Sequence, residues 1–182
     1  MSHTKILKVA AVQAAPVFLD RKATVEKACE LIAEAGKRKV SLVVFPEAFI
    51  PAYSDWVWVV PAGKKALLND LYAELIENAV TIPDDSTKRI CSAARKSKTH
   101  VVIGVNELNA ESSSASLYNS IIYIDSSGNI MGKHRKLVPT GGICAAASPG
   151  ATVLPLGSSG AVPAIAITLP MRTAREMPRI GS

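Results

Sequence analysis

The stretch Ser41-Leu42-Val43-Val44-Phe45-Pro46-Glu47 decides the fold. Its apolar run is short and Pro46 ends it, so it predicts a buried strand that delivers Glu47 at its carboxyl end. An earlier run of small and branched residues, 6–13, predicts a second buried strand, and residues 20–37 between the two repeat apolar side chains at helical spacing. A strand, a helix and a strand in this order predict a parallel pair and an α/β fold.

The chain beyond this strand continues with further helices and strands. We expect helices over residues 67–79 and 86–96, a strand over 100–105, and a hairpin of strands 117–124 and 130–133. Asp20 can cap the first helix, and Gly128 can supply the positive φ angle of the hairpin turn. We interpret residues 1–182 as one domain in which the regular pattern ends near Thr140, followed by an atypical tail over 141–182 that is rich in Ala, Ser, Gly and Pro.

The composition narrows the class of protein. The chain has 182 residues, of which 48% are hydrophobic, which is enough for one globular core. Its formal net charge is +6, but the Lys and Arg residues are scattered rather than gathered on one face, so nucleic-acid binding is not predicted. No apolar run approaches the roughly 20 residues that cross a bilayer, and the first residues lack a signal-peptide core. We therefore expect a cytoplasmic protein with no membrane partner.

The cysteine and histidine residues predict neither a disulfide framework nor a metal site. The chain has an odd number of cysteines and no CxxC pair; the cysteines are Cys29, Cys91 and Cys144. The histidines lack the spacing of metal ligands and are His3, His100 and His134. Cys29 and Cys91 fall in predicted helices, where a small packing role is the simplest interpretation.

Two charged residues stand out as candidates for chemistry. Glu47 follows a buried strand, where apolar neighbours would desolvate its carboxylate as a general base requires, although a partly exposed loop acid is the plainer interpretation. Lys136 ends the basic cluster Lys133-His134-Arg135-Lys136, which by itself is typical of a solvated sheet edge. Neither residue alone indicates a function.

Together the two segments resemble the motifs of the nitrilase family. The segment of residues 45–51 resembles the family's glutamate motif, and residues 133–140 resemble its lysine motif, with 136 − 47 = 89 residues between the two charges. Residues 9–16 and 117–120 add supporting matches, so that the resemblance covers about residues 5–140. It implies a nitrilase-like α-β-β-α sandwich, in which two mixed sheets stack between helix layers and subunits assemble into homo-oligomers.

The resemblance also implies a mechanism. A cysteine thiol attacks the carbon of a small nitrile, Glu47 serves as the base, and Lys136 stabilises negative charge on the substrate nitrogen, giving a carboxylic acid and ammonia. No metal or organic cofactor is implied. Cyanide hydration or amide hydrolysis by the same type of site is an alternative. Tyr53 and Trp56, after the glutamate motif, are candidate substrate-binding residues, with packing between subunits as the alternative.

The chain departs from the family pattern at the nucleophile. The family's Cys-Trp-Glu segment does not occur, and Cys144 is a poor candidate because it lies only 144 − 136 = 8 residues after Lys136. We therefore expect a sandwich that is incomplete at its C-terminus. One hypothesis is a reading-frame shift after about Thr140, and another is a catalytically inactive fragment or scaffold paralogue.

Overall fold

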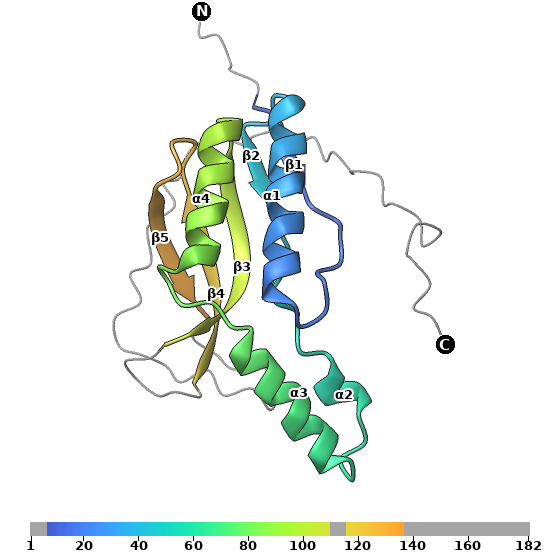
Figure 1. Cartoon of the computed structure of the whole chain (residues 1–182). Coiled ribbons are helices and arrows are strands. Elements are labelled where there is room, and N and C mark those ends of the chain that lie inside the picture. Colours follow the sequence, from blue (N-terminus) through green and yellow to red (C-terminus); the bar gives the residue numbers. More distant parts are fainter. Residues whose placement is uncertain (1–6, 110–115, 137–182) are drawn as a thin grey trace, which may run out of the picture.

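The computed structural model describes residues 7–109 and 116–136, and these contain five strands and four helices (Figure 1). The elements in chain order are β1 (Val9–Ala11), α1 (Arg21–Lys37), β2 (Leu42–Val44), α2 (Trp56–Val59), α3 (Lys65–Glu77), α4 (Asp85–Ser97), β3 (His100–Leu108), β4 (Leu117–Ile124) and β5 (Ile130–Arg135).

The strands form one mixed sheet in the order β1-β2-β3-β4-β5. β1, β2 and β3 run parallel, with Val43 opposite both Ala10 and Val101. β3, β4 and β5 are antiparallel, and Gly128 in the turn between β4 and β5 has φ +81°. The predicted parallel pair, the hairpin and the α/β class are confirmed.

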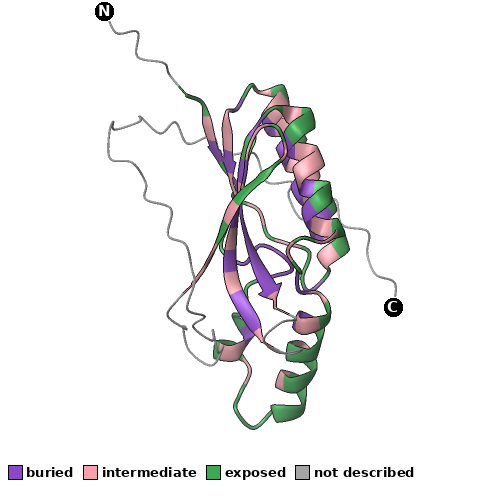
Figure 2. Cartoon of the chain, turned by 90° about the vertical axis from the view of Figure 1, so that its left-hand side faces the viewer, coloured by how far each residue is buried: buried purple, intermediate pink, exposed green. Residues whose placement is uncertain are grey.

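Helices α1 and α4 pack against each other and cover one face of the sheet (Figures 1 and 2). Each begins at an aspartate cap: the Asp20 side chain accepts from Ala23 N–H at 2.9 Å, and Asp84 accepts from Thr87 N–H at 2.8 Å. Their apolar stripes join every second residue of the strands in the core, which includes Val25, Ile32, Val43, Ile90, Val101, Ile103, Val105, Ile122 and Ile124.

Strand alternation sends the remaining side chains to the opposite face of the sheet. This face carries half-buried apolar residues, among them Leu42, Val44, Val102, Ile121 and Tyr123. The described residues thus supply one sheet and one helix layer of the predicted sandwich.

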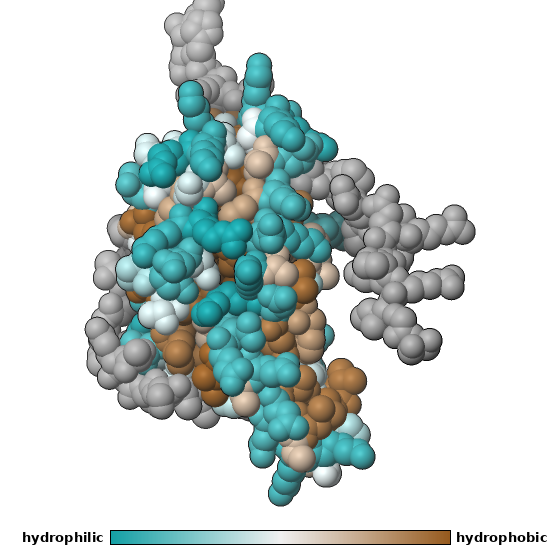
Figure 3. Space-filling view, in the orientation of Figure 1, coloured by the Kyte–Doolittle hydropathy of each residue, from teal (hydrophilic) through white to brown (hydrophobic). Residues whose placement is uncertain are grey.

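Helices α2 and α3 extend beyond the sheet (Figure 1). A second apolar cluster holds them there, made of Leu19, Trp56, Leu75, Ala79 and Leu117. Hydrophobic side chains gather on the surface over α2 (Figure 3), where Trp58 is 63% and Val59 79% exposed. None of the helices in the described part of the chain is long and apolar enough to pass through a bilayer.

Candidate active site

The segment after β2 places Glu47 on the sheet face opposite α1 and α4. Phe45 N–H still donates to Val102 O at 2.8 Å, and the chain then crosses Gly104, where a Cβ would lie 2.5 Å from Pro46 O. Gly104 faces away from the helices, since its neighbours in β3 belong to the helix-side core. The missing side chain of Gly104 therefore makes room for the backbone that carries Glu47.

Lys136 and Asn119 meet Glu47 on the same face. Lys136 N–H donates to Asn119 O at 2.8 Å, so the two residues lie opposite each other across β4 and β5. The Asn119 amide donates to Glu47 Oε1 at 2.6 Å and Lys136 Nζ donates to the same oxygen at 3.1 Å. Among residues 7–109 and 116–136, both donors to Glu47 bond to Oε1 and none bonds to Oε2.

The two predicted charges are therefore an ion pair, but Glu47 is not desolvated in the way its neighbours suggested. The side chains of Glu47 and Lys136 are 49% and 38% exposed. The flanking Phe45 and Phe49 turn into the core, with ring centroids 5.1 Å apart. The apolar neighbours in the sequence lie on the other side of the backbone from the carboxylate.

The candidate substrate-binding residues lie in different surroundings. Tyr53 is partly exposed, whereas Trp56 is buried in the second apolar cluster, edge to face with Phe18 at a centroid distance of 5.5 Å. A role for either residue toward substrate stays a prediction.

Neither thiol in the described residues faces Glu47. Cys29 and Cys91 lie on α1 and α4, on the helix side of the sheet, and burial raises the pKa of both thiols. A raised pKa favours the unreactive thiol over the nucleophilic thiolate. Their predicted packing role fits this position. Cys144 lies outside the described residues.

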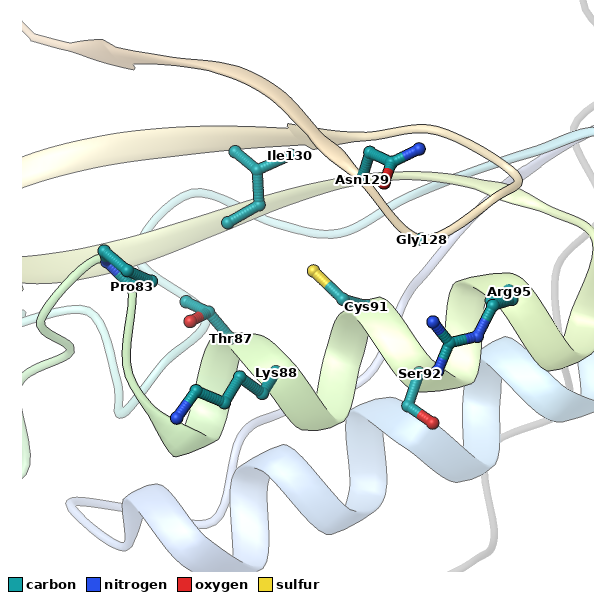
Figure 4. A pocket seen from close by; sticks show the side chains of 9 residues that line it. All are labelled: Pro83, Thr87, Lys88, Cys91, Ser92, Arg95, Gly128, Asn129 and Ile130. Carbon is teal, nitrogen blue, oxygen red and sulfur yellow. The ribbon is translucent and has the colours of Figure 1, made fainter.

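An open cleft of about 550 Å³ separates α4 from the β4–β5 hairpin (Figure 4). Cys91 points into it, with Arg95 and Ile130 on its walls. Because it lies on the helix side of the sheet, this cleft is distinct from the Glu47 and Lys136 site.

Sequence reasoning missed Glu107, which is 2% exposed on the helix side of β3. Burial raises its pKa, but hydrogen bonds from Arg135, Lys133 and Ser120 outweigh burial and hold the pKa below its ordinary value. It also missed the roles of Asn119 and Gly104. The available signal was polarity: Glu107 and Asn119 are among the few polar residues of strands that are mostly apolar.

The site's chemistry is that of a positioned carboxylate beside an ammonium. A carboxylate such as Glu47 can accept a proton, and Lys136 can stabilise negative charge that develops nearby. Within residues 7–109 and 116–136, His, Cys, Asp and Glu side chains do not gather in threes that could hold a metal ion.

Fold and site thus define a mixed α/β protein whose sheet carries a paired glutamate and lysine. The chain belongs to the carbon-nitrogen hydrolase family, whose model matches residues 8–171. The predicted resemblance to nitrilases is confirmed by an aliphatic nitrilase of Rhodococcus rhodochrous, 39% identical over 140 residues, and a nitrilase of Bacillus sp. (strain OxB-1), 38% identical over 140 residues. Each alignment covers 77% of this chain, which spans only 35% and 39% of those relatives.

Solved structures share the fold. Nit3 of Saccharomyces cerevisiae, a member of branch 10 of the nitrilase superfamily, superposes with a TM-score of 0.57 at 26% identity, over 75% of this chain and 48% of that one. An amidase from Nesterenkonia sp. also gives a TM-score of 0.57, at 19% identity, over 79% of this chain and 48% of that one.

Proposed function

We propose that the chain carries the glutamate and lysine of a nitrilase-type site that hydrolyses small nitriles to carboxylic acids and ammonia. The observation that carries the proposal is the contact of Lys136 Nζ with Glu47 Oε1 at 3.1 Å, between residues 89 positions apart. The similarity to named nitrilases supports the substrate class.

In the proposed reaction, Glu47 takes the proton of a cysteine thiol and the sulfur attacks the nitrile carbon. The carbon–nitrogen triple bond becomes the double bond of a thioimidate, and Lys136 stabilises the negative charge that builds on nitrogen. The proton that Glu47 took from the thiol passes to this nitrogen, which returns Glu47 to its carboxylate form. A first water, activated by Glu47, releases ammonia and leaves a thioester. A second water releases the carboxylic acid and restores the thiol. Half-exposure of the pair leaves substrate and water a path to it.

Ammonia release from a panel of aliphatic and aromatic nitriles tests the proposal. We expect Glu47→Gln to lower the rate by about 10²–10⁴, and Lys136→Met by about 10²–10³. The matched control is Glu34→Gln, which breaks an exposed pair with Arg38 and should leave the rate unchanged. Loss of ammonia release in Cys144→Ala would identify the nucleophile, and formation of formamide from added cyanide would favour cyanide hydration.

A non-catalytic scaffold is the second candidate, and the placement of the two thiols within the described residues favours it. Cys29 and Cys91 lie on the sheet face opposite Glu47. A chain that releases no ammonia from any nitrile, yet shows a cooperative unfolding transition, would favour the scaffold over the enzyme.

Assembly into homo-oligomers is part of the same proposal. Trp58, Val59 and Leu67 expose apolar surface on α2 and α3, and contiguous patches of this kind typically mark contacts between proteins. Sedimentation velocity at rising concentration measures the association, which Trp58→Lys should weaken.

A further inference from the structure

Glu107 is the centre of a buried cluster on the helix side of the sheet. Its carboxylate accepts from Arg135 Nε at 2.9 Å and Arg135 Nη2 at 2.7 Å, from Ser120 Oγ at 2.7 Å, and from Lys133 Nζ. The Arg135 guanidinium also lies 4.3 Å from the centre of the Tyr118 ring. Two of these donors, Lys133 and Arg135, come from β5, so Glu107 ties the edge strand to β3 across β4.

The pairing of β5 changes register along the strand. Next to the turn, Ile124 is opposite Ile130, but the next residue, Tyr123, is opposite Gly132. Met131 is therefore an extra residue on β5, which is the definition of a β-bulge. Beyond it, Ile122 faces Lys133 and Ser120 faces Arg135.

This extra residue decides which face Lys136 occupies, because a slip of one residue moves every side chain of a strand to the other face. If the register set at the turn continued without the bulge, Lys136 would lie opposite Tyr118, on the helix side. With the bulge, Lys136 lies opposite Asn119 and reaches Glu47.

We propose that Glu107 is a positioning residue of the site: by holding Lys133 and Arg135 on the helix side, it selects the bulged register that brings Lys136 to Glu47. The role of Glu107 in catalysis rests on the proposed function, whereas its effect on the register of β5 does not. The cluster is suited to the task because a buried carboxylate strongly disfavours any arrangement that leaves it without its charged donors. In the slipped register, Gly132 and His134 would replace Lys133 and Arg135 opposite Ile122 and Ser120, and the two-pronged contact of the guanidinium would be lost.

Proton NMR of the full chain measures the register directly. Lys136 N–H bonds to Asn119 O, so Asn119 and Lys136 form a hydrogen-bonded pair, and the Hα atoms of Ser120 and Arg135, and of Ile122 and Lys133, approach closely. These two Hα–Hα cross-peaks report the bulged register, and a cross-peak between Ser120 and His134 reports the slipped one. Glu107→Gln keeps the shape of the side chain and removes its charge. We expect it to lose the bulged-register cross-peaks, while Glu34→Gln, which breaks an exposed ion pair, keeps them.

Deletion of Met131 tests whether Glu107 selects the register of β5 or only stabilises the fold. Without that residue, the turn itself sets Lys133 and Arg135 on the helix side, so the register no longer depends on Glu107. We therefore expect Glu107→Gln to lose the cross-peaks in the natural chain and to keep them in the chain that lacks Met131.

Retention of the Ser120–Arg135 cross-peak in Glu107→Gln with Met131 present would overturn the proposal, and so would its loss in both backgrounds. If Glu107→Gln does not fold, Lys133→Met removes one donor and should give a mixture of registers, whereas a single bulged register would again overturn it. Ammonia release is not needed for these readings. If the chain has no hydrolytic activity, Glu107 cannot be called a positioning residue of a catalytic site. The NMR test of the register still holds in that case.

Discussion

Asn119 on β4 and Lys136, the residue directly after β5, lie opposite each other and donate to the same oxygen of Glu47, at 2.6 and 3.1 Å. The neutral amide holds the carboxylate in place without adding charge. Asn119 thus complements Lys136: one fixes the orientation of Glu47 and the other supplies a positive charge. Within the described residues, the second carboxylate oxygen accepts no hydrogen bond.

Replacing Asn119 by alanine tests this division of roles. A hydrogen bond to a charged group contributes about 1.5–3 kcal/mol, so we expect Asn119→Ala to lower kcat for ammonia release about tenfold or more with a smaller effect on KM. Asn69→Ala, on the exposed surface of α3, is the matched control. An unchanged kcat in Asn119→Ala would mean that Glu47 is positioned without it.

Gly104 is a second residue that the site requires, for steric reasons. A Cβ at this position would lie 2.5 Å from both Pro46 O and Ala48 N, which are backbone atoms with little freedom to move. We expect Gly104→Ala to lower the free energy of unfolding by about 1–3 kcal/mol and to displace Glu47. Gly63→Ala is the control, since no atom lies within 4 Å of its added Cβ, and urea unfolding compares the two. Equal stability of both variants would contradict the close approach.

At the level of single residues, the sequence predicted the two charged residues of the site but not the residues that hold them in place. Glu47 and Lys136 lie in recognisable motifs. The roles of Asn119 and Glu107 depend on which face each side chain occupies, and the extra residue Met131 reverses the faces of β5 relative to its turn. A bulge is not visible in the alternation of so short a strand.

At the level of elements, the long helices were predictable from apolar side chains at helical spacing, and α1 and α4 also begin at aspartate caps. The expected helix over residues 86–96 is observed as Asp85–Ser97, and the one over 67–79 as Lys65–Glu77. Helix α2, Trp56–Val59, was missed because four residues are too few to show a helical period.

The start of α4 provides a prediction at this scale. The Asp84 side chain accepts from Thr87 N–H, and Thr87 Oγ1 accepts from Asp84 N–H, each at 2.8 Å. We expect Asp84→Ala to cost about 1 kcal/mol of stability in urea unfolding. Asp85→Ala, which removes an exposed pair with Lys88, should change stability by less than about 0.5 kcal/mol. A larger loss in Asp85→Ala than in Asp84→Ala would refute the assigned cap.

At the level of the whole molecule, the two faces of the sheet differ: one holds the core and the other holds the candidate site. Helices α1 and α4 cover the face that holds the main core and the Glu107 cluster, while the Glu47 site lies on the other face. The nitrilase resemblance implied this layering, whereas the strand, helix and strand order predicted only the parallel pair and the α/β class. The sequence could not predict the course of the segment that crosses Gly104, which depends on a close backbone contact.

The Glu107 cluster also makes the stability of the molecule dependent on pH. Because the folded pKa of Glu107 lies below its ordinary value of 4.5, folding favours the carboxylate. Its contribution is complete above pH 4.5 and is lost as the pH falls through the lowered pKa. Urea unfolding from pH 7 to pH 3 should show this loss, and Glu107→Gln should flatten only part of it. The remainder includes Asp125, whose pKa is lowered by hydrogen bonds from Asn129. An unchanged pH profile in Glu107→Gln would contradict the prediction.

The claim that Glu47 and Lys136 act as one catalytic unit is tested most directly by ammonia release from nitriles in a double-variant comparison. Residues that serve one step together are strongly non-additive, so the double variant Glu47→Gln with Lys136→Met should be about as slow as the slower single variant. Rate losses that multiply, or a natural chain that releases no ammonia, would contradict the account.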